Sequence, residues 1–139
     1  MERYKDKQLS AYDRAAALAD TLSTEEQAQQ LKYDAPAIEK AGLPSYNWWN
    51  EGLHGVARTA TVFPQAIALA AAFDKDMMYR VGEVISTEAR AMYNSAAKHG
   101  DTDIYKGLTL WAPNINIFRD PRWVRGHETY GEDPYLTSR

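Results

Sequence analysis

The chain has no cysteine among its 139 residues. This absence excludes a disulfide framework, thiolate metal sites and cysteine nucleophiles. It does not fix the cellular compartment, because many exported proteins also lack cysteine. The apolar fraction of 45% is high enough to bury a core, so the composition is that of a folded chain and not of a disordered one.

The chain also lacks a large excess of either charge sign and lacks long apolar runs. The formal net charge is -3 and the basic residues are scattered, so the sequence predicts no surface for nucleic acid or an anionic membrane. The longest apolar run, residues 66–73, is too short to span a bilayer, and residues 1–7 lack the apolar core of a signal peptide. We therefore expect a soluble, cytoplasmic protein. No feature of the sequence indicates an oligomeric state.

Several catalytic and cofactor motifs are missing as well. The sequence has no phosphate-cradling glycine loop, no histidine pair at helical spacing for a metal, and no serine in a nucleophile elbow. Neither a cofactor nor a metal site is predicted. A glycosidase that uses two carboxylates is compatible with the 19 Asp and Glu residues, but abundance alone assigns no catalytic role.

Aromatic side chains are the abundant class, since four Trp and nine Tyr supply most of a 12% aromatic share. Two polar stretches, residues 46–55 and 121–136, combine such rings with carboxylates, basic groups and glycine. An aromatic ring suits the C–H face of a sugar, and the polar groups suit its hydroxyls. Both stretches therefore favour a carbohydrate site, although for any single ring core filling is an equally weighted interpretation.

The spacing of apolar residues predicts helices that alternate with short strands. The helices are expected at residues 7–22, 24–32, 65–73 and 75–98. Extended segments are expected at residues 44–48, 61–63 and 108–111. This order is typical of a parallel α/β fold, in which loops at the carboxyl ends of strands surround the functional site. Both aromatic stretches hold that position.

Glu51 is the candidate sugar ligand of the first stretch. It follows Trp49 closely, so its carboxylate could accept two hydrogen bonds from neighbouring hydroxyls while an indole covers the sugar. The alternative is that Glu51 braces its loop by pairing with a basic residue. His54, in a loop flanked by glycine, is more typical of a structural hydrogen-bonding residue than of a catalyst.

The second stretch contains two candidate arginines, Arg122 and Arg125, on either side of Trp123. Pairing with the nearby acids is the default explanation for both side chains. One guanidinium could instead bind vicinal hydroxyls through its planar fork. The spacing alone does not choose between the two arginines.

Four segments together resemble glycoside hydrolase family 3, and especially its β-xylosidase and α-L-arabinofuranosidase branch. These segments are residues 46–58, 60–67, 85–90 and 108–139. The resemblance implies a (β/α)8 TIM-like barrel and retaining hydrolysis by an aspartate nucleophile and a glutamate acid/base. It also implies that both catalytic residues lie outside this chain, so no catalytic residue is assigned in it.

The same resemblance implies binding residues. Glu51 matches the carboxylate that binds the hydroxyls of the terminal sugar, and Arg125 matches the pocket arginine. Trp49 and His54 are expected as neighbours of that sugar. Because Gly-Leu-His-Gly follows Glu51, as in xylosidases, a xyloside is the expected substrate, with glucosides and arabinosides as alternatives. Val124 stands where the family usually has Gly, so the orientation of Arg125 depends on whether that turn requires a positive φ.

A complete α/β barrel needs roughly 200 residues or more. We therefore expect residues 1–139 to be the N-terminal portion of a family 3 barrel domain, truncated at its C-terminal end. Such a fragment of a xylan-degrading exo-β-xylosidase would supply half of the pocket for a small oligosaccharide or glycoside and be inactive alone. Two alternatives are a non-catalytic sugar-binding or interaction module and a split-gene remnant without an independent fold.

Overall fold

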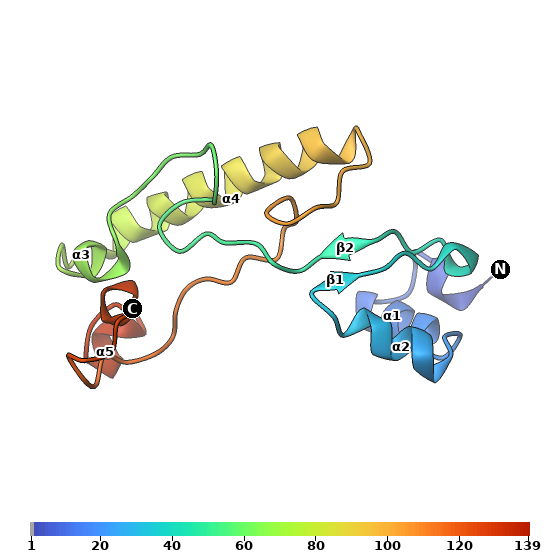
Figure 1. Cartoon of the computed structure of the whole chain (residues 1–139), viewed down its shortest axis with the longest axis horizontal. Coiled ribbons are helices and arrows are strands. Elements are labelled where there is room, and N and C mark those ends of the chain that lie inside the picture. Colours follow the sequence, from blue (N-terminus) through green and yellow to red (C-terminus); the bar gives the residue numbers. More distant parts are fainter. Residues whose placement is uncertain (1) are drawn as a thin grey trace. The chain divides into compact units, whose positions relative to one another are not determined.

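The computed structural model describes residues 2–139 and divides into two compact units, Met1–Asn47 and Trp48–Arg139. Figure 1 shows their helices and strands in chain order. Each unit has its own small set of buried residues, so each is described separately.

The first unit combines two short helices with a two-stranded antiparallel sheet. Its elements are η1 (Arg3–Lys5), α1 (Ala11–Ala19), α2 (Thr24–Gln30), β1 (Asp34–Ala35), η2 (Glu39–Ala41) and β2 (Tyr46–Asn47). The predicted capping box begins α2: Ser23 accepts from the Glu26 N–H at 3.2 Å, and the Glu26 carboxylate accepts from the Ser23 N–H at 2.8 Å. The expected start of this helix is thus confirmed.

Few residues make the core of the first unit. Tyr4, Ala35, Ile38 and Ala41 are buried, and the Tyr4 carbonyl accepts from Nε of Arg14 at 2.9 Å. That hydrogen bond joins η1 to α1, which also pack against each other. The helices α1 and α2 contribute no buried residue, so this core is small.

The second unit is built around one long helix. Its elements are α3 (Ala66–Ala70), α4 (Lys75–Ala97), η3 (Gly126–Glu128) and α5 (Pro134–Thr137). Asp74 caps α4, as predicted, by accepting from the Met77 N–H at 2.8 Å. Val81 and Ala89 are the buried residues of this helix, so it buries only a narrow stripe.

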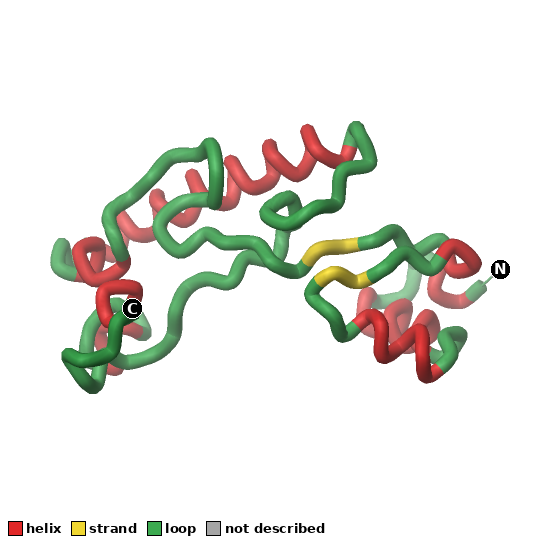
Figure 2. The backbone as a smooth tube through the Cα atoms, viewed as in Figure 1, coloured by secondary structure: helices red, strands yellow, loops and turns green. Residues whose placement is uncertain are grey.

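The parallel sheet expected from the sequence is not formed by the described residues. Their one sheet is the antiparallel pair in the first unit, and Figure 2 shows loop over most of the chain between β2 and α3. The segment predicted as a strand at 108–111 makes a single parallel bridge, Leu110 with Asn50. A parallel strand needs a ladder to a neighbour on its flank, and these residues provide only one rung of it.

Hydrogen bonds of Asn50 join these two segments where the sheet ladder is missing. Its side chain is 2% exposed, donates to the Thr109 carbonyl at 3.1 Å and accepts from the Gly107 N–H at 2.7 Å. Its carbonyl accepts from the Trp111 N–H at 2.8 Å. Gly52 packs so closely here that an added Cβ would lie 2.9 Å from the Leu110 side chain. The stretch at residues 46–55 and the segment at residues 107–111 are thereby held side by side.

No helix found between residues 2 and 139 is both long and apolar enough to cross a membrane. The expected cytoplasmic location stays a prediction.

Candidate functional site

A cavity of about 500 Å³ lies in the second unit. Its lining residues come from both polar stretches, from the segment at residues 108–111 and from the residue that precedes α3: Trp49, Glu51, Leu53, His54, Gln65, Trp111, Arg125 and Glu128. All four predicted site residues thus border one cavity. Sequence reasoning did not select the other four, of which Trp111 and Gln65 lie outside the two stretches.

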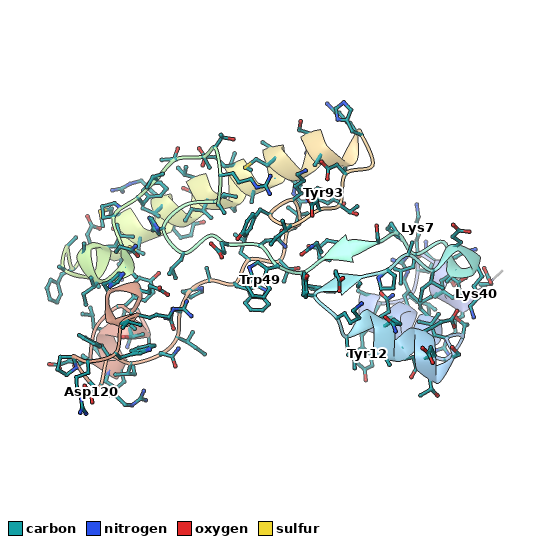
Figure 3. All side chains as sticks on the ribbon, in the orientation of Figure 1. Lys7, Tyr12, Lys40, Trp49, Tyr93 and Asp120 are labelled. Carbon is teal, nitrogen blue, oxygen red and sulfur yellow. The ribbon has the colours of Figure 1, made fainter. Side chains whose placement is uncertain are left out.

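Two stacked indoles form one wall of the cavity. The rings of Trp49 (labelled in Figure 3) and Trp111 have centroids 4.8 Å apart and planes inclined by 29°. Nε1 of Trp111 donates to the Trp48 carbonyl at 2.7 Å, which fixes the orientation of its ring. The stack follows from the hydrogen bonds of Asn50, because these bring the two segments together. A flat, partly exposed aromatic surface therefore faces the cavity.

The Glu51 carboxylate has one recorded side-chain contact, a long hydrogen bond of 3.5 Å from the Tyr105 hydroxyl to Oε1. Within residues 2–139 no basic side chain forms an ion pair with Glu51, so the structure does not support the loop-bracing alternative. The Arg58 guanidinium lies over the Tyr105 ring, 5.4 Å from its centre. Both Arg58 and Tyr105 have positive φ, 86° and 66°, a strained conformation that clusters at functional sites.

His54 is held by reciprocal hydrogen bonds with Phe63. The Phe63 N–H donates to the His54 carbonyl at 2.8 Å, and the His54 Nδ1 lies 2.9 Å from the Phe63 carbonyl. A carbonyl only accepts, so Nδ1 must carry the proton. In the neutral ring Nε2 then has a free lone pair and can accept a hydrogen bond from a ligand.

The structure distinguishes the two arginines. Arg122 is 89% exposed and pairs with Asp120 (labelled in Figure 3), Nη2 to Oδ2 at 2.5 Å, and it does not border the cavity. Arg125 borders the cavity and binds Oε2 of Glu128 through Nε at 2.8 Å and Nη2 at 2.5 Å. Val124 does not have a positive φ, so its β-branched side chain strains no turn here.

Charge pairing sets the protonation of this side of the cavity. The hydrogen bond from Arg125 holds the pKa of Glu128 below its usual value, and the same bond raises the pKa of Arg125. The Glu51 carboxylate is a smaller cause of the raised pKa of Arg125, so the two groups interact electrostatically. Glu128 is therefore ionised at neutral pH and unsuited to act as a general acid.

Gln65 carries a buried polar atom without a partner. Its Oε1 accepts no hydrogen bond from residues 2–139. Gln65 precedes α3, which packs against η3, the turn that contains Glu128. No local signal in the sequence marks this residue, because its position depends on that packing.

The cavity combines a carboxylate, a guanidinium, an imidazole and an aromatic wall. This set provides hydrogen-bond acceptors, donors and a flat apolar face, which together suit a polyhydroxylated ligand. No group of three or more His, Asp or Glu side chains in the described part of the chain could hold a metal ion. The arrangement therefore suits the binding of such a ligand.

The sequence matches a family model described as glycosyl hydrolase family 3 N terminal domain over residues 5–139. Over 97% of its length the chain is 45% identical to a xylan 1,4-beta-xylosidase of Xylanibacter ruminicola. It is 46% identical, over 96% and 89% of its length, to a probable exo-1,4-beta-xylosidase of Aspergillus flavus and the probable beta-D-xylosidase 7 of Arabidopsis thaliana. The chain spans only 16%, 18% and 17% of these three relatives.

A solved structure is similar as well. It is a GH3 exo-beta-xylosidase, XlnD, in complex with a xylobiose aziridine activity-based probe, and the TM-score is 0.85 at 36% identity. The similarity covers 99% of this chain and 18% of that protein. The fold of residues 2–139 therefore corresponds to one segment of a much longer protein.

Proposed function

The chain belongs to glycosyl hydrolase family 3, and we propose that it forms the N-terminal part of the catalytic domain of a retaining exo-β-xylosidase. Such an enzyme removes terminal β-linked xylose from small oligosaccharides. Relatives named as xylosidases in three organisms support this proposal, as does the similar XlnD structure with its xylobiose probe. Terminal glucose and arabinose are the alternative substrates to compare.

The observation that carries the proposal is the shared cavity of Glu51 and Arg125. A carboxylate accepts hydrogen bonds from two neighbouring hydroxyls, and a guanidinium donates to others. The cavity volume of about 500 Å³ lies in the range of small-ligand sites. We assign both side chains to the hydroxyls of the terminal sugar.

Trp49 and His54 complete our assignment. The stacked rings of Trp49 and Trp111 offer an apolar surface for the C–H face of the sugar. Nε2 of His54 accepts from a hydroxyl, because Nδ1 is engaged by the Phe63 carbonyl.

Hydrolysis with retention proceeds by double displacement. A carboxylate nucleophile attacks the anomeric carbon while an acid protonates the leaving oxygen, and water then cleaves the glycosyl-enzyme intermediate. We expect both catalytic groups outside residues 1–139. The role of this chain is to fix the sugar so that its anomeric carbon meets the nucleophile. Glu128, ionised beside Arg125, orients the guanidinium and does not act as the acid.

The finer architecture is part of the proposal. We infer that the loop-rich second unit belongs to a (β/α)8-like barrel, in which other strands would pair with the segment at residues 108–111. The single parallel bridge between Asn50 and Leu110 supports this inference.

The test replaces the matching segment of the Xylanibacter ruminicola xylosidase with residues 1–139. The chimera is expected to hydrolyse an aryl β-D-xyloside with retention, and faster than the matching β-D-glucoside or α-L-arabinofuranoside. The 139-residue chain alone is expected to hydrolyse none of them. Turnover by the chain alone, or an inactive chimera that still unfolds cooperatively, would contradict the proposal.

Variants of the same chimera test the binding residues. Glu51→Gln and Arg125→Gln should each lower kcat/KM by roughly 10- to 100-fold, because each removes a charged partner of a sugar hydroxyl. Arg122→Gln is the matched control, since Arg122 has a similar ion pair outside the cavity. Equal kcat/KM in all three variants would refute the assignment.

A further inference from the structure

Glu88 lies on α4 and does not border the cavity, yet both of its carboxylate oxygens bind one residue of a neighbouring loop. Thr61 donates its N–H to Oε2 at 2.9 Å and its hydroxyl to Oε1 at 2.6 Å. These bonds, the hydroxyl first, keep the pKa of Glu88 below its usual value, so the carboxylate is ionised at neutral pH. Two bonds to one residue fix its orientation as well as its position.

The loop that contains Thr61 contacts the segment that carries His54 at several points. Gly55 has φ 123°, and a Cβ at this position would lie 2.1 Å from the Thr61 carbonyl oxygen, so the two backbones touch. Two residues beyond Thr61, the Phe63 carbonyl meets Nδ1 of His54 at 2.9 Å. The Phe63 N–H also donates to the His54 carbonyl, so Phe63 and His54 are joined by two hydrogen bonds.

We propose that Glu88 is a positioning residue for this cavity. By holding Thr61, it keeps the Phe63 carbonyl against Nδ1 of His54 and so determines which tautomer His54 presents. With Nδ1 protonated, the Nε2 lone pair faces the ligand space as an acceptor. The use of that acceptor by a sugar rests on the proposed function, whereas the tautomer itself does not.

The experiment is long-range 1H–15N NMR of the histidine rings in the 15N-labelled chain, above the usual histidine pKa of about 6.5. In the wild type, His54 is expected as the Nδ1-protonated tautomer. In Glu88→Ala the ring is expected to lose this single form, and the Phe63 amide should exchange roughly tenfold faster or more. Glu83→Ala, an exposed carboxylate on the same helix, is the matched control and should change neither signal.

Two results would overturn the proposal. One is a wild-type His54 protonated at Nε2, and the other is a Glu88→Ala chain in which the ring and the Phe63 amide are unchanged. If Glu88→Ala no longer unfolds cooperatively, Thr61→Val replaces it, because this variant removes only the 2.6 Å hydroxyl bond. An unaltered His54 ring in Thr61→Val then counts against the proposal as well.

A titration with xylobiose separates this proposal from the proposed function. If Glu88 controls the tautomer but xylobiose shifts no cavity signal in either the chain or the chimera, the positioning role stands and the sugar site is wrong. If xylobiose binds the wild type and the Glu88→Ala chain with equal affinity although the tautomer is lost, the acceptor role of His54 is refuted. Weaker binding to Glu88→Ala, with the Glu83→Ala control unchanged, supports both.

Discussion

Asn50→Leu is the substitution for which the structure gives the clearest magnitude. The change keeps the branched shape of the side chain but removes at least two hydrogen bonds, to the Thr109 carbonyl and from the Gly107 N–H. Thr109 is exposed and Gly107 is half-buried, so water can replace part of each lost bond, and each bond contributes about 0.5–1.5 kcal/mol. We therefore expect the free energy of unfolding to fall by about 1–3 kcal/mol, which is measurable against the 5–15 kcal/mol that is typical of a folded domain.

Urea unfolding followed by tryptophan fluorescence measures this loss. Near-ultraviolet circular dichroism should also lose the signal of the Trp49–Trp111 stack, because Asn50 joins the segments that carry the two rings. Asn94→Leu, on an exposed position of α4, is the control and should change stability by no more than about 0.5 kcal/mol. If both variants unfold at the same urea concentration, Asn50 does not hold the cavity wall.

Three further predictions concern single sites of the second unit. Gly55→Ala should lower the free energy of unfolding, measured in urea, by about 1–3 kcal/mol or more, because position 55 has a φ of 123° and its new Cβ would clash with the Thr61 carbonyl. Gly100→Ala is the control and should lower the free energy of unfolding by less, because a Cβ there meets no atom within 4 Å. Gln65→Met removes an unpaired buried oxygen, so unfolding should show a stability equal to or above that of the wild type, and a clear loss would mean that this oxygen is paired. The pKa of Glu128 is lower in the folded chain than in the unfolded chain, where it is about 4.3. The ionised carboxylate therefore stabilises the folded state fully above pH values near the unfolded pKa, and this stabilisation is lost as the pH falls through the lower pKa of the folded state. Glu128→Gln should therefore flatten the acid side of the pH–stability curve, and an unchanged slope would contradict the ion pair.

Local signals in the sequence predicted the helices well. The capping box at Ser23 and the N-cap at Asp74 depend only on residues close in the sequence, and both are confirmed. The parallel sheet is not confirmed by the described residues, which form one parallel bridge between Asn50 and Leu110, because pairing depends on which strands lie nearby and not on the strand's own residues. For the same reason no pattern in the sequence indicated the long-range bonds of Asn50 or the pairing of Glu88 with Thr61.

The binding role of the candidate site stays a prediction, but its four predicted residues border one cavity. Residue types in the two polar stretches were sufficient to nominate Glu51 and Trp49, since carboxylates and indoles are what a sugar requires. Gln65 and Trp111 were missed because neither belongs to those stretches. They border the cavity through long-range contacts: the packing of α3 against η3 for Gln65, and the hydrogen bonds with Asn50 and Trp48 for Trp111.

For the two arginines, residue type does not predict which side chain borders the cavity. Arg122 and Arg125 each bind a nearby acid through Nε and Nη2, so their local chemistry is nearly the same. Their surroundings differ, because Arg125 is followed by Gly126, where a Cβ would lie 2.2 Å from the Phe118 ring. Only glycine allows η3 to pack this closely, and that packing accompanies Arg125 at the cavity while Val124 stays 83% exposed. Residue type and spacing therefore do not distinguish the two arginines, whereas the packing of η3 against Phe118, which lies outside residues 121–136, accompanies the arginine that borders the cavity.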